Sequence, residues 1–255
     1  MKIGVLCHPT YGGSGVVASE LALSLAERGH EVHLFSHRAP PRLARASGRV
    51  ELHVAQGVPY PLFHTTPHDL AITSAVLDLH ESVGLDILHA HYALPHAVCA
   101  LLARSAAKGQ AGRKAPRVVT TLHGTDITLV GNDQTYAPLV RYTLAASDAV
   151  TAVSADLVRR TAENFGPEAM ADRIEVVPNF VDLTEFHPGV APARSGSPPT
   201  VVHVSNFRPV KRVPWLVEAF ALARGPGRIL TGFSRKAGGQ INVRQPRDIS
   251  DQAAP

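Results

Sequence analysis

Hydrophobic positions along this chain follow two alternating patterns. Short runs of branched and aliphatic residues, typical of buried strands, are separated by longer segments in which hydrophobic residues recur at helical spacing. The runs predict strands near residues 2–7, 31–36, 50–55, 86–90, 117–122, 148–153, 173–177 and 200–205. The longer segments predict helices near residues 15–28, 69–83, 95–107, 136–146, 155–165 and 213–223. Strands that alternate with helices indicate an α/β protein with a parallel sheet and right-handed crossovers.

Composition divides the chain into four parts. Residues 1–187 hold seven of the eight predicted strands and are expected to form a doubly wound, Rossmann-like domain. Residues 188–199 are rich in Pro, Gly and Ser, as in a linker, and residues 200–225 would begin a second Rossmann-like domain that stays incomplete. Residues 226–255 are too polar to bury a core, so we expect an aberrant, disordered tail.

The net charge of +4 is concentrated in this tail. Residues 226–255 contain five Lys or Arg and two Asp, a net charge of +3, so the rest of the chain is nearly neutral. A nucleic-acid-binding protein would need a basic face on its folded part. We therefore expect no nucleic-acid partner.

Cysteine content and hydropathy indicate the cellular compartment. The two cysteines, Cys7 and Cys99, suggest no disulfide framework and favour a reducing cytoplasm. No hydrophobic run approaches the roughly 20 residues that a membrane-spanning helix needs. We expect a cytoplasmic protein without a membrane span, and the sequence leaves homo-oligomer formation open.

A glycine-rich turn follows the first predicted strand. Gly13, Ser14 and Gly15 precede a predicted helix, where glycines permit a tight turn and close approach of a ligand to the backbone. The spacing also satisfies a loose dinucleotide motif, which requires an acidic residue at the end of the second strand. That strand ends at His37, so NAD is disfavoured, while Arg38 leaves NADP open.

Three histidines follow the strand predicted at 86–90. His89, His91 and His96 offer metal ligands, but the only nearby carboxylate is Asp86 at the start of the strand. Zinc sites usually have three or four ligands with supporting carboxylates. We therefore favour a polar strand end that lines a cleft, with no metal.

The loop after the strand predicted at 117–122 is dense in hydrogen-bonding groups. His123 can donate or accept near neutral pH, and Thr120, Thr125 and Asp126 can orient it. An ordinary turn with Thr or Asp as a helix cap is the alternative. Because ligands of open α/β sheets bind at the carboxyl ends of the strands, we expect these loops to line one cleft.

Residues 204–212 have the pattern of a phosphate-binding loop. They follow a β-branched run at 200–204 and precede a helix that opens near Pro214. A helix N-terminus offers unpaired N–H groups and a positive dipole end. Arg208 and Lys211, just before this helix, are expected to bind a diphosphate, and a solvated basic turn is the alternative.

Six short motifs are spread over residues 12–212. They are Gly-Gly-Ser-Gly at 12–15, His-Tyr-Ala-Leu-Pro-His at 91–96, Thr-Leu-His-Gly-Thr-Asp-Ile-Thr at 121–128, Val-Thr-Ala-Val-Ser at 150–154, Pro-Asn-Phe-Val-Asp at 178–182 and Val-Ser-Asn-Phe-Arg-Pro-Val-Lys-Arg at 204–212. Together they resemble the retaining GT-B glycosyltransferases of family 4, over about residues 1–224. More narrowly, the resemblance implies transfer of N-acetylglucosamine from UDP-N-acetylglucosamine to L-malate, the first step of bacillithiol biosynthesis.

The resemblance also implies roles for individual residues. The acceptor L-malate would lie against the first domain, near Ser14, Tyr92, Thr120, His123 and Arg141. The diphosphate of the donor would be bound by Arg208, Lys211 and the backbone amides of Gly13, Ser14 and Gly15. The implied substrate-binding set also includes Thr125, Asp126, Asn179 and Asn206.

Catalysis in such an enzyme would depend on three of these residues. His123 would orient and polarise the donor sugar, while Arg208 and Lys211 would stabilise the charge that gathers on the leaving UDP. By resemblance, the reaction retains configuration without a metal or another cofactor.

The sequence departs from the family after Arg224. Family members continue with the rest of the second domain, including paired glutamates that bind the donor, whereas this chain has no Glu beyond Glu218. We expect a truncated or frameshifted end and impaired activity. Two alternatives stay open: a family 4 enzyme with another donor or acceptor, and a non-catalytic acceptor-domain fragment.

Overall fold

The structure is a computed structural model. It describes residues 1–43, 48–59, 61–62, 64–108, 114–131, 133–166, 173–184, 187, 203, 205 and 209–224. The chain divides into two compact units, Met1–Val190 and Ala191–Pro255. The expected linker at 188–199 and tail at 226–255 lie outside the described residues, so these domain boundaries stay predictions.

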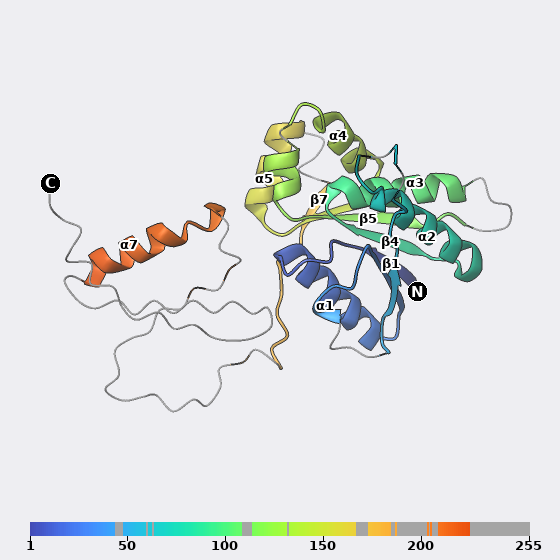
Figure 1. The fold of residues 1–255 in the computed structure, drawn as a ribbon, viewed down its shortest axis with the longest axis horizontal. Coiled ribbons are helices and arrows are strands. Elements are labelled where there is room, and N and C mark those ends of the chain that lie inside the picture. Colours follow the sequence, from blue (N-terminus) through green and yellow to red (C-terminus); the bar gives the residue numbers. More distant parts are fainter. Residues whose placement is uncertain are drawn as a thin grey trace. The chain divides into compact units, whose positions relative to one another are not determined.

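Seven parallel strands form a single sheet in the first unit (Figure 1). The strands are β1 (Lys2–Leu6), β2 (Glu31–Ser36), β3 (Glu51–Val54), β4 (Ile87–His91), β5 (Arg117–Leu122), β6 (Ala149–Ala152) and β7 (Ile174–Val176). Their order across the sheet is β3-β2-β1-β4-β5-β6-β7, and every neighbouring pair is parallel. The predicted α/β fold with a doubly wound parallel sheet is therefore confirmed.

All six predicted helices are present. They are α1 (Gly13–Glu27), α2 (His68–Val83), α3 (Val98–Ala107), α4 (Ala137–Ala146) and α5 (Ala155–Phe165) in the first unit and α7 (Val213–Arg224) in the second. Shorter turns are η2 (Ala93–Ala97) and η3 (Asp126–Val130), both π-helical, and the 3-10 turn η4 (Pro209–Lys211). Among the described residues, no helix combines the length and hydrophobicity needed to cross a bilayer.

The two faces of the sheet are covered by different helices. Ala18 of α1 belongs to a buried cluster with Val5 and Leu34. Leu6 directly follows Val5, so its side chain points to the opposite face. There it joins Ile72 of α2 in a second buried cluster, which also includes residues of α3. Burial on both faces explains why the central strands appear in the sequence as continuous hydrophobic runs.

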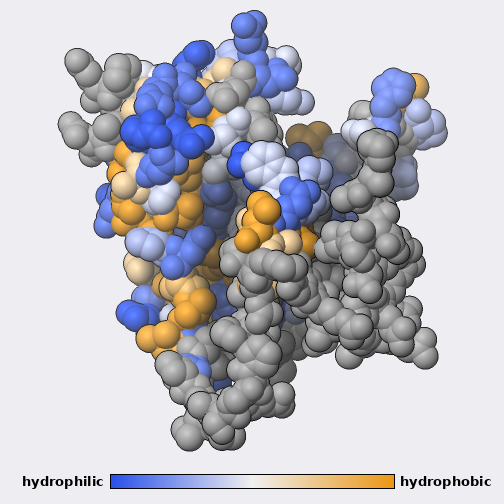
Figure 2. All heavy atoms as spheres, turned by 90° about the vertical axis from the view of Figure 1, so that its left-hand side faces the viewer, coloured by the Kyte–Doolittle hydropathy of each residue, from blue (hydrophilic) through white to orange (hydrophobic). Residues whose placement is uncertain are grey.

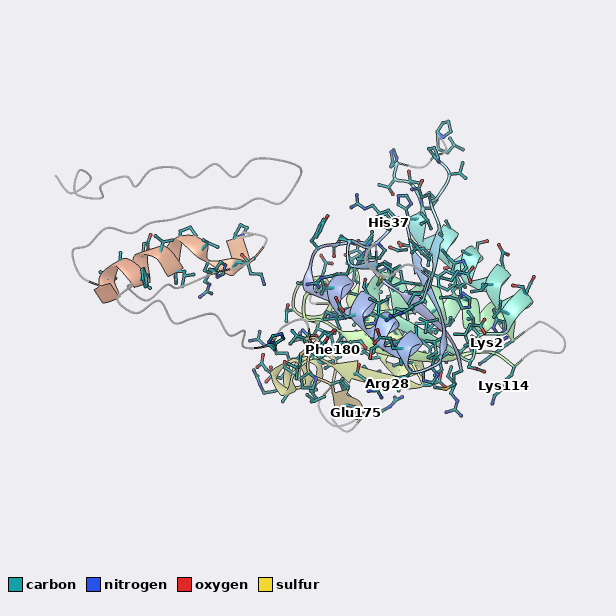
Figure 3. All side chains as sticks on the ribbon, turned by 90° about the horizontal axis from the view of Figure 1, so that it is seen from below. Lys2, Arg28, His37, Lys114, Glu175 and Phe180 are labelled. Atoms are coloured by element: carbon teal, nitrogen blue, oxygen red, sulfur yellow. The ribbon has the colours of Figure 1, made fainter. Side chains whose placement is uncertain are left out.

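The sheet changes winding direction between β1 and β4. These two strands are neighbours, but the chain proceeds from β1 to β2 and β3 on one side and from β4 to β5, β6 and β7 on the other. The connections that follow β1 and β4 therefore lead to helices on opposite faces of the sheet, α1 on one and α3 on the other. The point between the carboxyl ends of these two strands, here called the crevice, is where open α/β sheets bind ligands. In Figure 3, His37, just beyond the carboxyl end of β2, lies on the other side of the first unit from Lys2, at the amino end of β1.

Two predicted elements differ from the structure. The helix expected at 95–107 begins as α3 only at Val98, after the turn η2. Leu94 has φ −128° and ψ 134°, the extended conformation favoured before a proline, which keeps the α-helix from starting earlier. The strand expected at 200–205 lies mostly outside the described residues, and the two described there, His203 and Ser205, are not in a strand.

Some large hydrophobic side chains reach the surface, where Figure 2 shows orange and blue side chains mixed on one face. Phe180 and Val181, in the segment after the edge strand β7, are 44% and 60% exposed. Trp215 and Leu216 of α7 are 65% and 38% exposed. Exposed hydrophobic patches often mark interaction surfaces, and the homo-oligomer left open by the sequence stays a prediction.

Candidate functional site

The loops after β1, β4 and β5 meet at the crevice between β1 and β4. The ring of His8, which follows β1, lies 5.4 Å from the ring of Tyr92 and 4.3 Å from that of His96, both after β4. Tyr92 in turn lies 5.3 Å, ring to ring, from His123, which follows β5. The predicted convergence of strand-end loops is thus observed for the three loops of the first unit. We call His8, Tyr92, His96 and His123 the crevice cluster.

A buried carboxylate holds two of these loops together. Asp126 is 1% exposed, and its Oδ1 accepts hydrogen bonds from the backbone N–H groups of His123 (3.2 Å) and Gly124 (2.9 Å). Its Oδ2 accepts from the N–H of Ala93, in the loop after β4, at 3.2 Å. Burial raises the pKa of Asp126, and these backbone hydrogen bonds partly oppose the rise. Asp126 therefore acts as a positioning residue for His123 and Tyr92.

Tyr92 has an unusual backbone conformation. Its φ of 88° lies in the left-handed region, which non-glycine residues rarely occupy. The hydroxyl of Tyr92 is 2.9 Å from Oγ1 of Thr125, a hydrogen bond that joins the loops after β4 and β5 a second time. Strain of this kind persists where the surroundings determine the conformation, and it is common at binding sites.

A second histidine lies beneath His123. Nδ1 of His91, which is fully buried, is 2.9 Å from Nε2 of His123. Nε2 of His91 has no hydrogen-bond partner among the described residues. Because an orphaned buried N–H is rarer than an orphaned acceptor, we assign the proton of His91 to Nδ1, where it donates to His123. His123 then carries its own proton on Nδ1, where it is available to a ligand oxygen.

The histidines around the crevice are held neutral. Burial lowers the pKa of His123 and of His89 to about 4 and that of His96 to about 3. Burial also lowers the pKa of His91 well below its usual value. Neighbouring histidines add to most of these shifts through charge repulsion. At neutral pH each ring can donate one hydrogen bond and accept one. The site is therefore suited to binding hydroxyl groups rather than to supplying positive charge.

Two of these histidines use a ring nitrogen in contacts within the protein. Nδ1 of His96 donates to the backbone carbonyl of His91 at 2.8 Å, and Nε2 of His89 is 2.7 Å from Oγ1 of Thr121. The only group of three ligand atoms close enough for one ion, within the described ranges, lies elsewhere and is taken up below.

The glycine turn lies at the start of α1, beside the loop that holds His8. A Cβ on Gly15 would be 2.6 Å from the carbonyl oxygen of Thr10 and 2.7 Å from that of His8, so only glycine fits there. Gly12 caps α1 without a side-chain hydrogen bond, and Ser14 is 7% exposed. The first amides of α1 are therefore positioned as an anion site next to the crevice.

The other predicted site residues belong partly to the first unit and partly to the second. Thr120 is fully buried and its hydroxyl bonds to Oγ of Ser147 at 2.8 Å, while the guanidinium of Arg141 stacks 5.9 Å from the ring of Phe165. Asn179 is exposed in the loop after β7. Their contacts with substrate stay predictions. In the second unit, Lys211 is exposed in η4, whereas Asn206 and Arg208 lie outside the described residues.

Sequence reasoning missed His8 as a site residue. The signal was its position directly after the first predicted strand, the same position that identified His91 and His123. His37, after β2, stacks on His68 of α2 with ring centroids 4.9 Å apart. This pair also lowers the pKa of His37, through burial first and then the charge of His68.

Comparisons with known proteins agree with this architecture. A family model described as Glycosyltransferase Family 4 matches residues 11–185. N-acetyl-alpha-D-glucosaminyl L-malate synthase of Bacillus anthracis is 42% identical over 227 residues, covering 87% of this chain and 58% of the relative. D-inositol 3-phosphate glycosyltransferase of Nocardia farcinica is 30% identical over 252 residues, covering 86% of this chain and 52% of the relative. The chain therefore spans little more than half the length of these relatives.

Solved structures show the same fold at low sequence identity. Anabaena HepE in complex with UDP-glucose matches with a TM-score of 0.53 and 18% identity, over 72% of this chain and 45% of that chain. Sucrose-phosphate synthase from Thermosynechococcus elongatus matches with a TM-score of 0.52 and 16% identity, over 74% of this chain and 51% of that chain.

Proposed function

Because the chain belongs to glycosyltransferase family 4, as its motifs predicted, we propose that it is a retaining transferase that moves N-acetylglucosamine from UDP-N-acetylglucosamine to L-malate. The identity of 42% to an N-acetyl-alpha-D-glucosaminyl L-malate synthase supports these substrates. The observation that carries the proposal is the convergence of three strand-end loops on the crevice cluster, where the sheet changes direction. On this proposal, the first unit binds the acceptor.

The proposed acceptor site lies above β4 and β5. Hydrogen-bond donors from Tyr92, Thr125 and His123 would contact the hydroxyl and carboxylate oxygens of L-malate. Arg141 would pair with a malate carboxylate, since its planar guanidinium suits that partner. With its pKa lowered to about 4, His123 would be neutral and would orient and polarise the sugar rather than act as a charged acid.

The proposed donor contacts follow the family resemblance. The N–H groups of Gly13, Ser14 and Gly15 would bind one end of the diphosphate at the start of α1. By the same resemblance, Lys211 and Arg208, with Asn206, would stabilise the negative charge of the leaving UDP. These cations would offset the charge of the leaving diphosphate, so we propose a reaction without a metal or another cofactor.

The assay for this function compares acceptors. The full chain is incubated with UDP-N-acetylglucosamine and one of L-malate, D-malate or D-inositol 3-phosphate, and UDP release is measured. We expect release with L-malate at least about tenfold above the other acceptors, which corresponds to about 1.4 kcal/mol of discrimination. Faster UDP release with D-inositol 3-phosphate would identify that compound, rather than L-malate, as the acceptor.

A measurement of L-malate binding distinguishes an active enzyme from a fragment that only binds the acceptor. L-malate is titrated into the protein calorimetrically, with His123→Gln as the test variant and the exposed His64→Gln as its control. His123→Gln loses one hydrogen bond to L-malate, so its affinity for L-malate should fall about tenfold. The affinity of His64→Gln should equal that of the wild type. Binding without UDP release would identify the fragment alternative, and equal affinity of the variants would remove His123 from the site.

The cytoplasmic location is retained as part of the proposal. Cys7 and Cys99 are both free and buried, and burial raises the pKa of their thiols to about 12 and about 11. Thiols of this kind are unreactive, as suits structural cysteines in a reducing compartment.

A further inference from the structure

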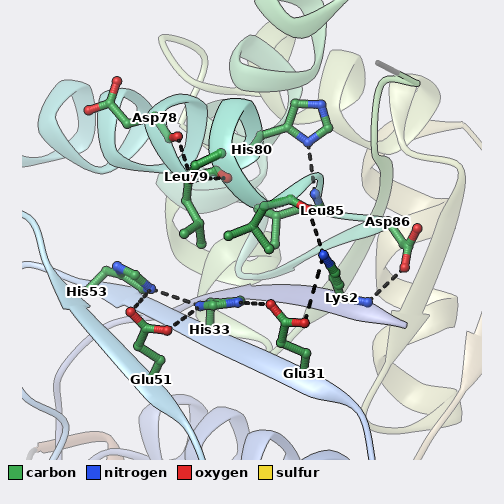
Figure 4. A network of polar contacts seen from close by, with 12 residues as sticks. Lys2, Glu31, His33, Glu51, His53, Asp78, Leu79, His80, Leu85 and Asp86 are labelled. Atoms are coloured by element: carbon green, nitrogen blue, oxygen red, sulfur yellow. Dashed lines mark hydrogen bonds and ion pairs between the residues drawn. The ribbon is translucent and has the colours of Figure 1, made fainter. Parts of the chain in front are cut away.

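We propose that His33, Glu51 and His53 form a binding site for one divalent transition-metal ion, of the zinc type, between β2 and the edge strand β3. The three side chains converge on one face of the sheet, as Figure 4 shows. None of them has a role in the proposed transferase reaction. We call this set the β2–β3 triad.

Strand register brings the triad together. His33 of β2 is directly opposite Glu51, the first residue of β3. Side chains two residues apart on a strand share a face, so His53 lies on the same side as Glu51, and Glu31 on the same side as His33. The pairing of two parallel strands thus assembles two imidazoles and two carboxylates that are distant in the sequence.

The spacing of the ligand atoms fits a tetrahedral ion. Zinc–nitrogen and zinc–oxygen bonds of about 2.0–2.1 Å place the ligand atoms of a tetrahedral site about 3.3 Å apart. Nδ1 of His33 is 3.0 Å from Nε2 of His53 and 3.3 Å from Oε2 of Glu51. Nε2 of His53 is 3.7 Å from Oε1 of Glu51. The first two separations are close to the expected value, and the third is slightly longer and joins His53 to the other oxygen of Glu51. A small rotation of the Glu51 side chain would let one of its oxygens bind the ion together with both imidazoles.

Neighbouring groups prepare His33 and His53 as ligands. Oε1 of Glu31 can only accept a hydrogen bond, so Nε2 of His33, 3.2 Å away, donates to it and leaves a lone pair on Nδ1 facing the triad. A carboxylate behind a ligating histidine is the usual supporting contact of a metal site. The ring of His53 stacks on Phe35 at a centroid distance of 4.8 Å, which restricts its orientation.

Solvent can reach the triad from one side. The His33 side chain is 3% exposed, that of His53 is 21% exposed and that of Glu51 is 65% exposed. An ion could therefore enter beside Glu51 and keep a water molecule as its fourth ligand. Two imidazoles and one carboxylate suit Zn²⁺ and its neighbours in the first transition row, rather than Mg²⁺ or Ca²⁺.

The expected consequence is structural. Among the described strands, β3 lies at the edge of the sheet and pairs with β2 alone. An ion that binds the folded triad, but not the unfolded chain, stabilises the native state by mass action. The ion would link Glu51, the first residue of the edge strand β3, to β2. This link lies away from the loops at the carboxyl ends that form the crevice.

Metal titration of the full chain tests the proposal. Protein freed of metal by a chelator is titrated with Zn²⁺ by calorimetry, and Co²⁺ is added separately because its visible spectrum reports tetrahedral coordination. The test variants are Glu51→Gln and His53→Gln, and the exposed His64→Gln is the control. Glu31→Gln removes the carboxylate behind His33, which also forms a 4.0 Å ion pair with Lys2. Thermal unfolding is followed by circular dichroism with and without Zn²⁺.

We expect about one Zn²⁺ per wild-type chain, a tetrahedral Co²⁺ spectrum and a higher Tm with Zn²⁺. Glu31→Gln should weaken Zn²⁺ binding by about ten- to a hundredfold, and Glu51→Gln or His53→Gln should weaken it at least as much. His64→Gln should bind as the wild type does. Absence of Zn²⁺ binding by the wild type would overturn the proposal. So would Zn²⁺ affinities of Glu51→Gln and His53→Gln equal to that of the wild type, if both variants retain the native circular dichroism spectrum. If His53→Gln fails to fold, Glu51→Gln decides, because that side chain is mostly exposed.

Discussion

Replacing Asp126 should loosen the crevice in two distinguishable steps. Its carboxylate accepts three backbone hydrogen bonds, from Ala93 on one loop and from His123 and Gly124 on the other. Asp126→Ala removes both acceptor oxygens and so all three hydrogen bonds. Asp126→Asn keeps a carbonyl oxygen for His123 and Gly124 but turns an amide N–H₂ toward the N–H of Ala93, so one hydrogen bond is lost.

The magnitudes follow from the burial of the three donors. The N–H of Ala93 belongs to a fully buried residue, and an unsatisfied buried donor costs about 1–3 kcal/mol. His123 and Gly124 are half-buried, so water can replace part of their loss. We therefore expect Asp126→Asn to lower the free energy of unfolding by about 1–3 kcal/mol and Asp126→Ala by roughly 2–5 kcal/mol.

Urea unfolding at pH 7, followed by far-ultraviolet circular dichroism, measures this difference. Tryptophan fluorescence is unsuitable because the single tryptophan, Trp215, lies in the second unit. The exposed Asp78 of α2 provides the control, and Asp78→Ala should stay within about 0.5 kcal/mol of the wild type. A loss below about 1 kcal/mol for Asp126→Ala would refute the idea that this carboxylate joins the two loops.

Two further predictions concern pH and the glycine turn. Three histidines near the crevice have pKa values of about 3–4 in the folded chain, below the usual value near 6.5: the half-buried His89 and His123 and the buried His96. Below pH 6.5 the unfolded chain therefore binds more protons than the folded chain, so the free energy of unfolding is greatest above that pH and falls as the pH drops toward 4. If the three histidines titrate independently, the fall between pH 7 and 5.5 is roughly 3–4 kcal/mol. Denaturant midpoints that stay constant over this range, measured at matched ionic strength, would contradict the assignment of neutral rings. At the start of α1, Gly15→Ala should cost about 1–3 kcal/mol in urea unfolding because its Cβ meets two carbonyl oxygens at 2.6 and 2.7 Å, whereas Gly13→Ala, which meets nothing within 4 Å, should be tolerated. Equal stability of these two variants would show that the turn adapts.

Local pattern was enough to predict most elements of the first unit. The alternation of hydrophobic runs with helical periodicity identified all seven strands of the sheet and the five α-helices around it, because parallel strands buried on both faces are continuously hydrophobic. It missed the turn η3 and the delayed start of α3. Both depend on local backbone geometry, such as the extended Leu94 before Pro95, that hydrophobic periodicity does not record.

The composition of the site was decided only by tertiary structure. The sequence marked Tyr92 and His123 through their places after strands, but it could not tell that β1 lies beside β4 and so brings His8 against Tyr92 and His96.

The fold also decided which hydrogen-bond partners the predicted site residues have. The hydroxyl of Thr120 is directed to Ser147 in the core, and Asp126 supports the loops from beneath them, because burial and partners are set by packing. The register of β2 on β3 likewise places His33 opposite Glu51. A sequence determines which residues follow which strand, whereas the order and register of the strands determine which residues meet, since those contacts form only when distant segments pack together.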